Sequence, residues 1–283
     1  LPPCRSVSSE SRFSALAILP VRGVGYPPAT QLGELLDGFH ASKSFGDNPK
    51  AFDELLDEAE AGGGAESMAR LRSRDKMPIR ERISHVLDPD SPFLEISPLA
   101  GYDSSYAIGG GFVVGIGVIA GVECVVVGND PTVLGGAMTP YMAKKWMRAL
   151  EIARQNRMPY VSFVESAGAD LRVQTTEGGS GKRRRARLEH FAETGRFFYE
   201  MIELSKLGIP TVCVVFGSST AGGAYQPGMS DYTIFIRDQS KVFLAGPPLV
   251  KMATGEDADD ESLGLSLIHI SEPTRPERIG CGR

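Results

Sequence analysis

The sequence predicts an α/β fold in which helices cover a mainly parallel sheet. Four runs are apolar and rich in β-forming residues, at 112–119, 122–127, 160–165 and 211–216. Two longer runs with helical periodicity lie between them, at 139–156 and 188–207. Strands that alternate with helices of this length are typical of parallel βαβ units. The composition agrees, because 42% hydrophobic and 23% charged residues are ordinary for a globular protein.

Three segments precede the first of these strands. Residues 1 to about 50 mix Pro, Gly and Ser without periodicity, which indicates an extension with no core of its own. The pattern at 48–72 is helical and is interrupted by three glycines at 62–64. A short amphipathic helix follows and ends near Pro89. Its apolar positions are Ile79, Ile83, Val86 and Leu87.

Local signals connect the later elements. Ala120 and Gly121 join the first two strands in a tight hairpin, and apolar residues on both faces of these strands predict that they are buried. In the helix at 139–156, Pro140 suits the first turn and Trp146 is expected to face a core. Two further short strands are expected after a glycine-rich turn, at 232–236 and 241–244.

Charge and cysteine spacing exclude several classes of protein. A formal net charge of -5 argues against a general nucleic-acid-binding surface. No two of the four cysteines have Cys-x-x-Cys spacing, so no metal site is predicted. Cys124 and Cys213 lie in apolar runs and are interpreted as reduced, buried thiols. No apolar run is long enough for a membrane span. We expect a cytoplasmic protein, or one of the mitochondrial matrix if the source is eukaryotic.

Two turns rich in small residues follow strands of the predicted sheet: ESAGAD at 165–170 and SSTAGGAYQPGMSD at 218–231. The first backbone N–H groups of a helix have no internal partner, so such strand-to-helix junctions bind ligands in α/β proteins. Small side chains leave these amides open to a ligand oxygen. Together the two turns are candidates for an oxyanion hole. The alternative is that each glycine only forms a turn.

Two phosphate-binding motifs are excluded. The run GGSGKR at 178–183 fails the P-loop pattern, because Thr176 occupies the first glycine position and Arg183 the Ser/Thr position. The glycines from Gly109 onward precede a hairpin and no helix, so the dinucleotide fingerprint fails as well. The basic run KRRRAR at 182–187 is interpreted as a solvated loop, with contact to CoA phosphates or to an acidic partner as the alternative.

Side-chain chemistry is sparse in this sequence. His85 and His190 have no neighbouring nucleophile and acid with triad-like spacing. Glu165 and Asp231 are candidate acids, but helix and turn capping explains them equally well. Amide donors without an acid–base pair favour chemistry in which the protein stabilises an enolate, and this points to thioesters.

Five blocks of sequence occur in a specific order between about Met68 and Gly264. They are MPIRERISHVLDPDSPFLEISPLA, NDPTVLGGAMTP, ESAGAD, SSTAGGAYQPGMSD and VFLAGPPLVKMATGE. In this order and spacing they resemble the carboxyltransferase (β) subunit of biotin-dependent acyl-CoA carboxylases, and the last block is most similar to the methylcrotonyl-CoA type. The resemblance implies a crotonase-like α/β spiral of ββα units, an acyl-CoA substrate, and transfer of a carboxyl group from carboxybiotin to the acyl chain.

The same resemblance implies roles for particular residues. The backbone amides that hold the thioester oxygen are assigned to Gly168, Ala169, Gly222 and Gly223. Substrate-binding positions are assigned to five neighbours: Ser166, Ala167, Ala221, Ala224 and Tyr225. The family commonly has Gly-Gly-Ala-Arg where this chain has residues 167–170 as Ala-Gly-Ala-Asp, so the arginine is replaced here.

Cofactors, partners and domains are also implied by the resemblance. Carboxybiotin is expected on a partner subunit or domain, and ATP is expected to be used by the partner biotin carboxylase. A biotin carboxylase or biotin carboxyl carrier subunit and further copies of the β subunit are the expected partners. The expected domains are an extension at 1–67 and an N-terminal carboxyltransferase domain at 68–264. Residues 265–275, LSLIHISEPTR, resemble the translation of a transposase sequencing adapter, so 265–283 are expected to be no domain.

The biotin site is expected to lie in a second homologous domain, so we expect this chain to hold the acyl-CoA half-site and to be inactive alone. Three alternatives stay open. A sodium-pump-type acyl-CoA decarboxylase subunit would use the same transfer in reverse. An enoyl-CoA hydratase or isomerase would share the amides but needs a positioned carboxylate base. An inactive fragment would bind CoA without turnover.

Overall fold

The computed structural model describes residues 49–169, 195–257, 259, 263 and 265–266. The chain divides into two units, Leu1–Pro49 and Lys50–Arg283. All that follows concerns the second unit, together with Pro49, the first residue of its first helix. Several predicted features lie outside the described residues: most of the N-terminal extension, the basic run at 182–187, His190 and most of the segment 265–283.

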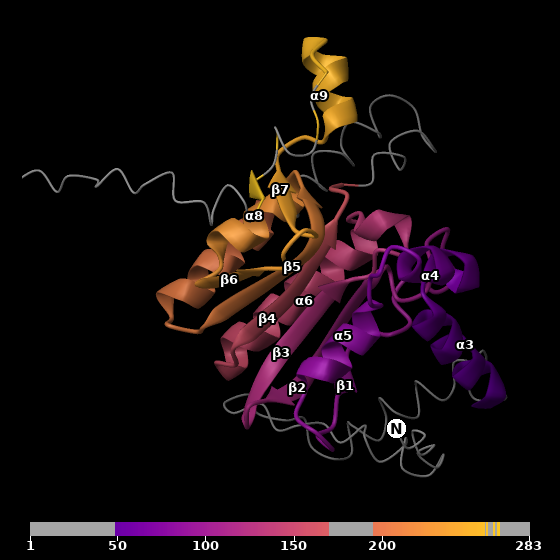
Figure 1. The fold of residues 1–283 in the computed structure, drawn as a ribbon. Helices are drawn as coiled ribbons and strands as arrows, with labels where there is room; N and C mark the ends of the chain where they lie inside the picture. The colour runs from indigo at the N-terminus through magenta and orange to yellow at the C-terminus, as the bar shows by residue number, and fades with distance from the viewer. Residues whose placement is uncertain (1–48, 170–194, 258, 260–262, 264, 267–283) are drawn as a thin grey trace, which may run out of the picture. The chain divides into compact units, whose positions relative to one another are not determined.

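One sheet of eight strands organises this unit (Figure 1). The strands are β1 (Leu94–Glu95), β2 (Phe112–Ile119), β3 (Val122–Asn129), β4 (Tyr160–Ser166), β5 (Thr211–Thr220), β6 (Tyr232–Phe235), β7 (Lys241–Phe243) and β8 (Leu265–Ser266). β2 pairs antiparallel with β3, whereas β3, β4 and β5 are parallel neighbours. β6 and β7 both pair parallel with β5. The predicted α/β class with parallel βαβ units is confirmed.

The hairpin between β2 and β3 is confirmed, and its cause is local. Ala120 and Gly121 both have positive φ, 51° and 77°, as a two-residue turn between twisted strands requires. The carboxylate of Asp88 accepts a hydrogen bond from each of their N–H groups, both at 2.7 Å. These two bonds satisfy the amides that the turn would otherwise leave without partners.

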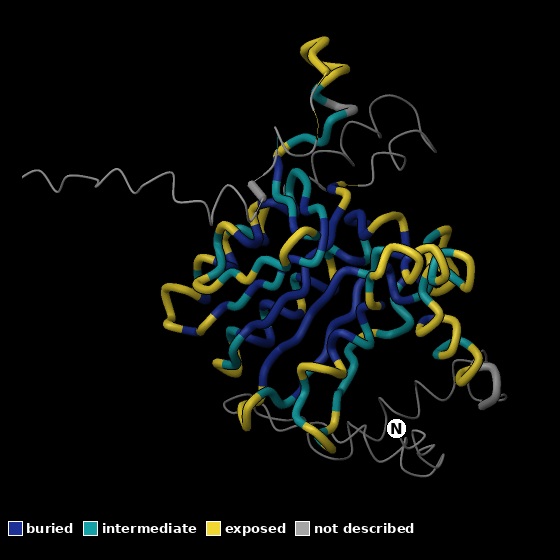
Figure 2. The backbone as a smooth tube through the Cα atoms, in the orientation of Figure 1, coloured by how far each residue is buried: buried dark blue, intermediate teal, exposed yellow. Residues whose placement is uncertain are grey.

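Alternate residues of β3 enter two different cores, so the strand is buried on both faces. Val125 and Val127 pack with helix α6 (Pro140–Asn156) and with the helical segment 195–206. Cys124 and Val126 pack with helix α5 (Ile79–Val86) on the opposite face. Helices therefore cover both faces of the sheet, and the central strands form the most buried part of the unit (Figure 2). The prediction of buried strands is confirmed.

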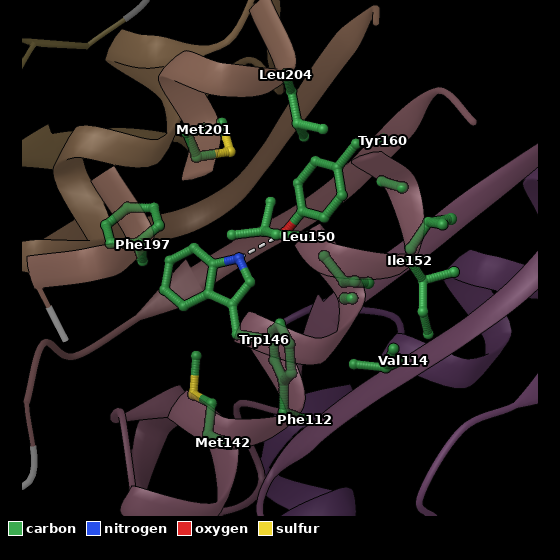
Figure 3. Close-up of a cluster of buried hydrophobic side chains, with 14 of the residues drawn as sticks. Phe112, Val114, Met142, Trp146, Leu150, Ile152, Tyr160, Phe197, Met201 and Leu204 are labelled. Atoms are coloured by element: carbon green, nitrogen blue, oxygen red, sulfur yellow. Dashed lines mark hydrogen bonds between the residues drawn. The ribbon is translucent and has the colours of Figure 1, made fainter. Parts of the chain in front are cut away.

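Helix α6 begins and ends where its sequence indicates. The Thr139 hydroxyl accepts the N–H of Met142 at 3.1 Å, and Pro140 occupies the first turn. Trp146 is 2% exposed and donates its indole N–H to the Tyr160 hydroxyl at 2.6 Å (Figure 3). The ring of Phe197, from the segment 195–206, lies 4.1 Å from the Trp146 ring. The expected core position of Trp146 is confirmed.

Gly62 and Gly63 separate two helices, α3 (Pro49–Ala61) and α4 (Gly64–Arg72), and Gly64 is the first residue of α4. Gly63 donates its N–H to the Thr132 hydroxyl at 2.9 Å. A Cβ atom on Gly63 would lie 2.0 Å from the Thr132 carbonyl oxygen. Only glycine permits this close approach, so the helical break docks on the loop after β3.

The structure differs from the prediction in the region after β5. Helix α8 (Gly222–Met229) replaces the expected glycine-rich turn, and helix α9 (Pro247–Thr254) was not predicted. Three glycines and Pro227 hide the helical character of α8, because both residue types are poor helix formers. β5 also runs to Thr220, past the expected end at 216, because residues 218–220 pair with β7. A short 3-10 turn, η1 (Leu134–Gly136), and strands β1 and β8 were likewise not predicted.

Candidate functional site

The two turns singled out in the sequence meet at the carboxyl ends of β4 and β5. Ser166 and Ser219 are direct partners in the pairing of these strands. A Cβ atom on Gly168 would lie 3.5 Å from the Cβ of Ala221, and one on Gly223 would lie 2.9 Å from the Cβ of Ser166. The structure therefore brings residues of both turns into contact.

Two backbone hydrogen bonds join the first turn to η1 and to the residues that follow η1. Ala167 donates its N–H to the Gly135 carbonyl at 3.1 Å, and the Gly168 carbonyl accepts from Met138 at 2.7 Å. The N–H of Gly168, at a φ of 90°, donates to the Ser166 hydroxyl at 3.2 Å. The amides of Ala167 and Gly168 thus already have partners, whereas the exposed Ala169 donates its N–H to none of the described residues.

The second turn is the start of α8. Ala221 has φ 52° and ψ -119°, a conformation that is strained for a residue with a Cβ atom, and its N–H donates to the Phe243 carbonyl at 3.1 Å. No side chain caps the helix, so the N–H groups of Gly222 and Gly223 have no hydrogen-bond partner in the described part of the chain. These are the amides at the positive end of the helix dipole.

Among the described residues of the paired turns, three backbone amides therefore have no hydrogen-bond partner, those of Ala169, Gly222 and Gly223. Hydrogen-bond donors of this kind stabilise a negative charge that develops on a carbonyl oxygen. Of the other predicted positions, Ala224 is buried and donates its N–H to the Ala221 carbonyl at 3.0 Å. Tyr225 is 47% exposed, and its ring packs edge-to-face on Phe198.

Glu165 is the first residue of the first turn, and its carboxylate forms two ion pairs. It contacts Lys76, and Arg82 approaches it at 3.3 Å from α5. Arg82 is 4% exposed, and its guanidinium lies over the Phe216 ring at 4.3 Å. Burial lowers the pKa of Arg82, and the Glu165 charge opposes that effect. Glu165 is thus a member of a buried charge cluster.

Sequence reasoning missed this cluster, because its members are far apart along the chain and no local pattern relates them. The other candidate acid is also engaged in hydrogen bonds, to the start of a strand rather than as the cap of a helix or turn. Asp231 accepts hydrogen bonds from the Thr211 N–H at 2.8 Å and the Thr211 hydroxyl at 2.9 Å. It thereby ties the end of α8 to the start of β5.

A buried lysine lies outside the two turns. Lys145 on α6 is 4% exposed and donates from its ammonium group to the Gly109 carbonyl at 3.1 Å. Desolvation lowers the pKa of Lys145 to about 8.

No cluster of His, Cys, Asp or Glu within the described ranges has the geometry to hold a metal ion. None of the described helices is both long and apolar enough to cross a membrane.

Comparison with known proteins places these turns in a family. The model of the carboxyl transferase domain matches residues 70–272, which include both turns. The chain is 52% identical over 214 residues to a probable biotin-dependent acyl-coenzyme A carboxylase beta2 subunit of Mycobacterium tuberculosis, covering 76% of this chain and 38% of that protein. It is 46% identical over 211 residues to a probable mitochondrial methylcrotonoyl-CoA carboxylase beta chain of Drosophila melanogaster, covering 74% and 35%.

A solved structure agrees with the sequence matches. The beta subunit of geranyl-CoA carboxylase from P. aeruginosa superposes with a TM-score of 0.66 at 38% identity, covering 90% of this chain and 43% of that one. The predicted crotonase-like α/β fold and the resemblance to acyl-CoA carboxylase β subunits are confirmed. The chain spans about two-fifths of the length of these relatives, between 35% and 43%. With both turns inside the matched segment, the chain belongs to the carboxyl transferase domain family.

Proposed function

We propose that this chain carries the acyl-CoA half of the carboxyltransferase reaction of a biotin-dependent acyl-CoA carboxylase. The observation that carries the proposal is the meeting of two amide-bearing turns at the ends of β4 and β5, in a chain of the carboxyl transferase family. The thioester carbonyl of the substrate would accept hydrogen bonds from Ala169, Gly222 and Gly223. Gly168 shapes the first turn, since its own N–H is bonded to Ser166.

The proposed chemistry follows from where negative charge develops. Removal of a proton from the acyl chain moves charge onto the thioester oxygen, and the biotin that gives up the carboxyl group would take that proton. Amides fixed before the reaction stabilise the charge on the oxygen without reorganising. The α8 dipole adds a favourable field at the same point. Loss of one such donor in other enzymes lowers kcat by roughly 100- to 1,000-fold. Carboxybiotin supplies the carboxyl group, and no described residue is assigned to it.

The hydratase or isomerase alternative needs a carboxylate base beside the thioester. Among the described residues, Glu165 is the acidic residue of the first turn, and its two ion pairs with Lys76 and Arg82 hold it in the buried cluster. Asp231 is equally engaged, at the far end of α8. This arrangement favours stabilisation of an enolate by amides over acid–base catalysis by the described carboxylates.

A methylcrotonyl-CoA-like substrate is the finer part of the proposal. Its support is the similarity to the methylcrotonoyl-CoA carboxylase beta chain and to the geranyl-CoA carboxylase beta subunit. Isothermal titration of the chain with methylcrotonyl-CoA, propionyl-CoA and free CoA tests the choice. We expect the tightest binding for the first. Equal affinity for the two thioesters would contradict the substrate assignment.

Partners and location are proposed on related grounds. A biotin carboxylase or biotin carrier partner, which would use the ATP, and further copies of the β subunit would complete the enzyme. The exposed apolar side chains of Tyr199, Ile202 and Tyr225 offer a surface for such contacts. A cytoplasmic or matrix location is supported by the free thiols of Cys124 and Cys213, which are buried and unpaired with each other.

The mechanism can be tested without biotin. Methylcrotonyl-CoA labelled with 13C at the thioester carbonyl is mixed with the chain, and the carbonyl stretch is followed by difference infrared spectroscopy. Hydrogen bonds to the carbonyl oxygen weaken the C=O bond, so we expect its frequency to fall on binding. A bound thioester with an unshifted carbonyl would refute the proposed amide site. Adding carboxybiotin separately tests turnover, and we expect no carboxylated product from this chain alone.

A further inference from the structure

Helix α8 contains a proline where a hydrogen-bond donor would normally be. In an α-helix the carbonyl of residue 223 accepts from the N–H of residue 227. Residue 227 is Pro227, which has no N–H, so the Gly223 carbonyl loses its helical partner. Gly223 is buried, and a buried carbonyl without a partner is costly.

The missing bond is supplied from the sheet. The hydroxyl of Ser219, near the end of β5, donates to the Gly223 carbonyl at 2.8 Å. Ser219 is completely buried, so water does not compete for this bond. The bond joins the end of the strand to the first turn of the helix, across the tight bend at Ala221.

Gly223 is also fitted closely against the strand ends. A Cβ atom on it would lie 2.9 Å from the Ser166 Cβ and 3.4 Å from the Ser219 hydroxyl oxygen. The glycine therefore rests directly on two serines that are partners across β4 and β5. Its carbonyl accepts the Ser219 hydroxyl, and its N–H has no partner among the described residues.

We infer that Ser219 is a positioning residue for the oxyanion hole, and that Pro227 creates the need for it. Because Pro227 has no N–H, it cannot donate to the Gly223 carbonyl within the helix, and the Ser219 hydroxyl donates to this carbonyl instead. This fixes Gly223, and hence the direction of its N–H, relative to the first turn on β4. The inference rests on the proposed function, because it assigns Ser219 to holding an amide that the thioester oxygen would contact.

A matched control exists on the same helix. Ser230 donates its hydroxyl to the Gln226 carbonyl at 2.9 Å, at the opposite end of α8 from Gly222 and Gly223. Replacement of Ser230 by alanine removes a bond of the same kind at a distance from Gly222 and Gly223. A purely structural role for Ser219 predicts that the two serine variants behave alike in thioester binding.

The test uses three variants: Ser219→Ala, Ser230→Ala and the double variant Ser219→Ala with Pro227→Ala. In the double variant the N–H of residue 227 is restored and can donate to Gly223 within the helix. Each is titrated with carbonyl-labelled methylcrotonyl-CoA and with free CoA, and the bound carbonyl stretch is recorded. Thermal unfolding, followed by circular dichroism, reports whether each variant is folded.

We expect Ser219→Ala to bind the thioester about fivefold more weakly, the effect of one lost hydrogen bond, with unchanged affinity for free CoA. Its carbonyl shift should be smaller than that of the unmodified chain. Ser230→Ala should keep both the affinity and the shift. The double variant should recover both towards the values of the unmodified chain.

Two outcomes would overturn the inference. One is a Ser219→Ala variant whose affinity and carbonyl shift equal those of Ser230→Ala. The other is a double variant that recovers neither, including the case in which both Ser219 variants fail to fold. A thioester carbonyl that is unshifted even in the unmodified chain would instead refute the proposed function, so the two failures are distinguishable.

Discussion

Gly222 and Gly223 are neighbours at the start of α8, yet the structure predicts opposite effects when each is replaced by alanine. No described atom lies within 4 Å of a Cβ on Gly222. A Cβ on Gly223 would lie 2.9 Å from the Ser166 Cβ and 3.1 Å from its hydroxyl oxygen. Position 222 has space for a methyl group, whereas position 223 is closely packed. The Gly222 variant therefore tests ligand access to the amides, and the Gly223 variant tests packing.

The magnitudes follow from these contacts. Gly222→Ala should stabilise the fold by about 0.5 kcal/mol, because alanine restricts the unfolded chain and is accommodated in the helix. Gly223→Ala should destabilise it by about 1–3 kcal/mol, the usual cost of overpacking a well-filled site. A bulkier residue such as valine at 223 would disturb the fold more, and so would not report on the amide alone.

Urea unfolding of the two variants and of the unmodified chain measures both changes in the free energy of unfolding. The comparison requires that this free energy falls with urea concentration at the same slope in all three proteins. Titration with methylcrotonyl-CoA then measures access to the amide. We expect Gly222→Ala to be at least as stable as the unmodified chain and to bind the thioester more weakly, since its methyl group lies beside a proposed donor. Equal unfolding free energies for the two variants would refute the packing argument.

Three further predictions concern other residues. Ala221→Gly should raise the free energy of unfolding by about 1 kcal/mol, because glycine relieves the strain at φ 52°. Part of this stabilisation is offset, since glycine makes the unfolded chain more flexible. A lower free energy of unfolding in urea would contradict this prediction. Glu165→Gln should cost about 3 kcal/mol, because it leaves two cations in the buried cluster without their anion. Glu66→Gln, which breaks an exposed pair, should cost less than about 0.5 kcal/mol in the same assay, and equal costs would refute the cluster's burial as the cause. Lys145→Met should remove part of the pH dependence of stability: the pKa of Lys145 is about 8 in the folded chain and 10.5 when unfolded, so the unfolded state binds more protons between these values. The unmodified chain should therefore gain on the order of 3 kcal/mol relative to the variant from pH 8 to 10.5, and parallel stability curves would contradict this.

Local chemistry explains why much of the fold was predictable. Thr139 and Pro140 mark the start of α6 with groups that act on their own helix. The Ala120-Gly121 turn requires positive φ at two adjacent positions, which a short sequence can indicate. In each case the residues that specify the element are contained in it or lie beside it. The strands around them followed from their apolar runs.

Helix α8 shows where such reasoning fails. Its glycines and Pro227 argue against a helix locally, and the bond that completes its first turn comes from Ser219 on the preceding strand. A long-range strand pairing likewise extended β5 beyond its apolar run. Contacts outside the segment decided these elements, so local propensity gave the wrong state.

The sequence alone sufficed to identify the α/β class, the two small-residue turns and the resemblance to carboxyltransferases, because each is carried by contiguous residues. Which amides are available was decided only by tertiary contacts. Ala167 donates its N–H to Gly135 and Gly168 donates to Ser166, whereas the N–H groups of Ala169, Gly222 and Gly223 donate to none of the described residues. The pairing of Glu165 with Lys76 and Arg82 joins residues more than 80 positions apart. Hydrogen bonds and ion pairs between distant segments depend on how the sheet aligns its strands, and no local pattern encodes that alignment.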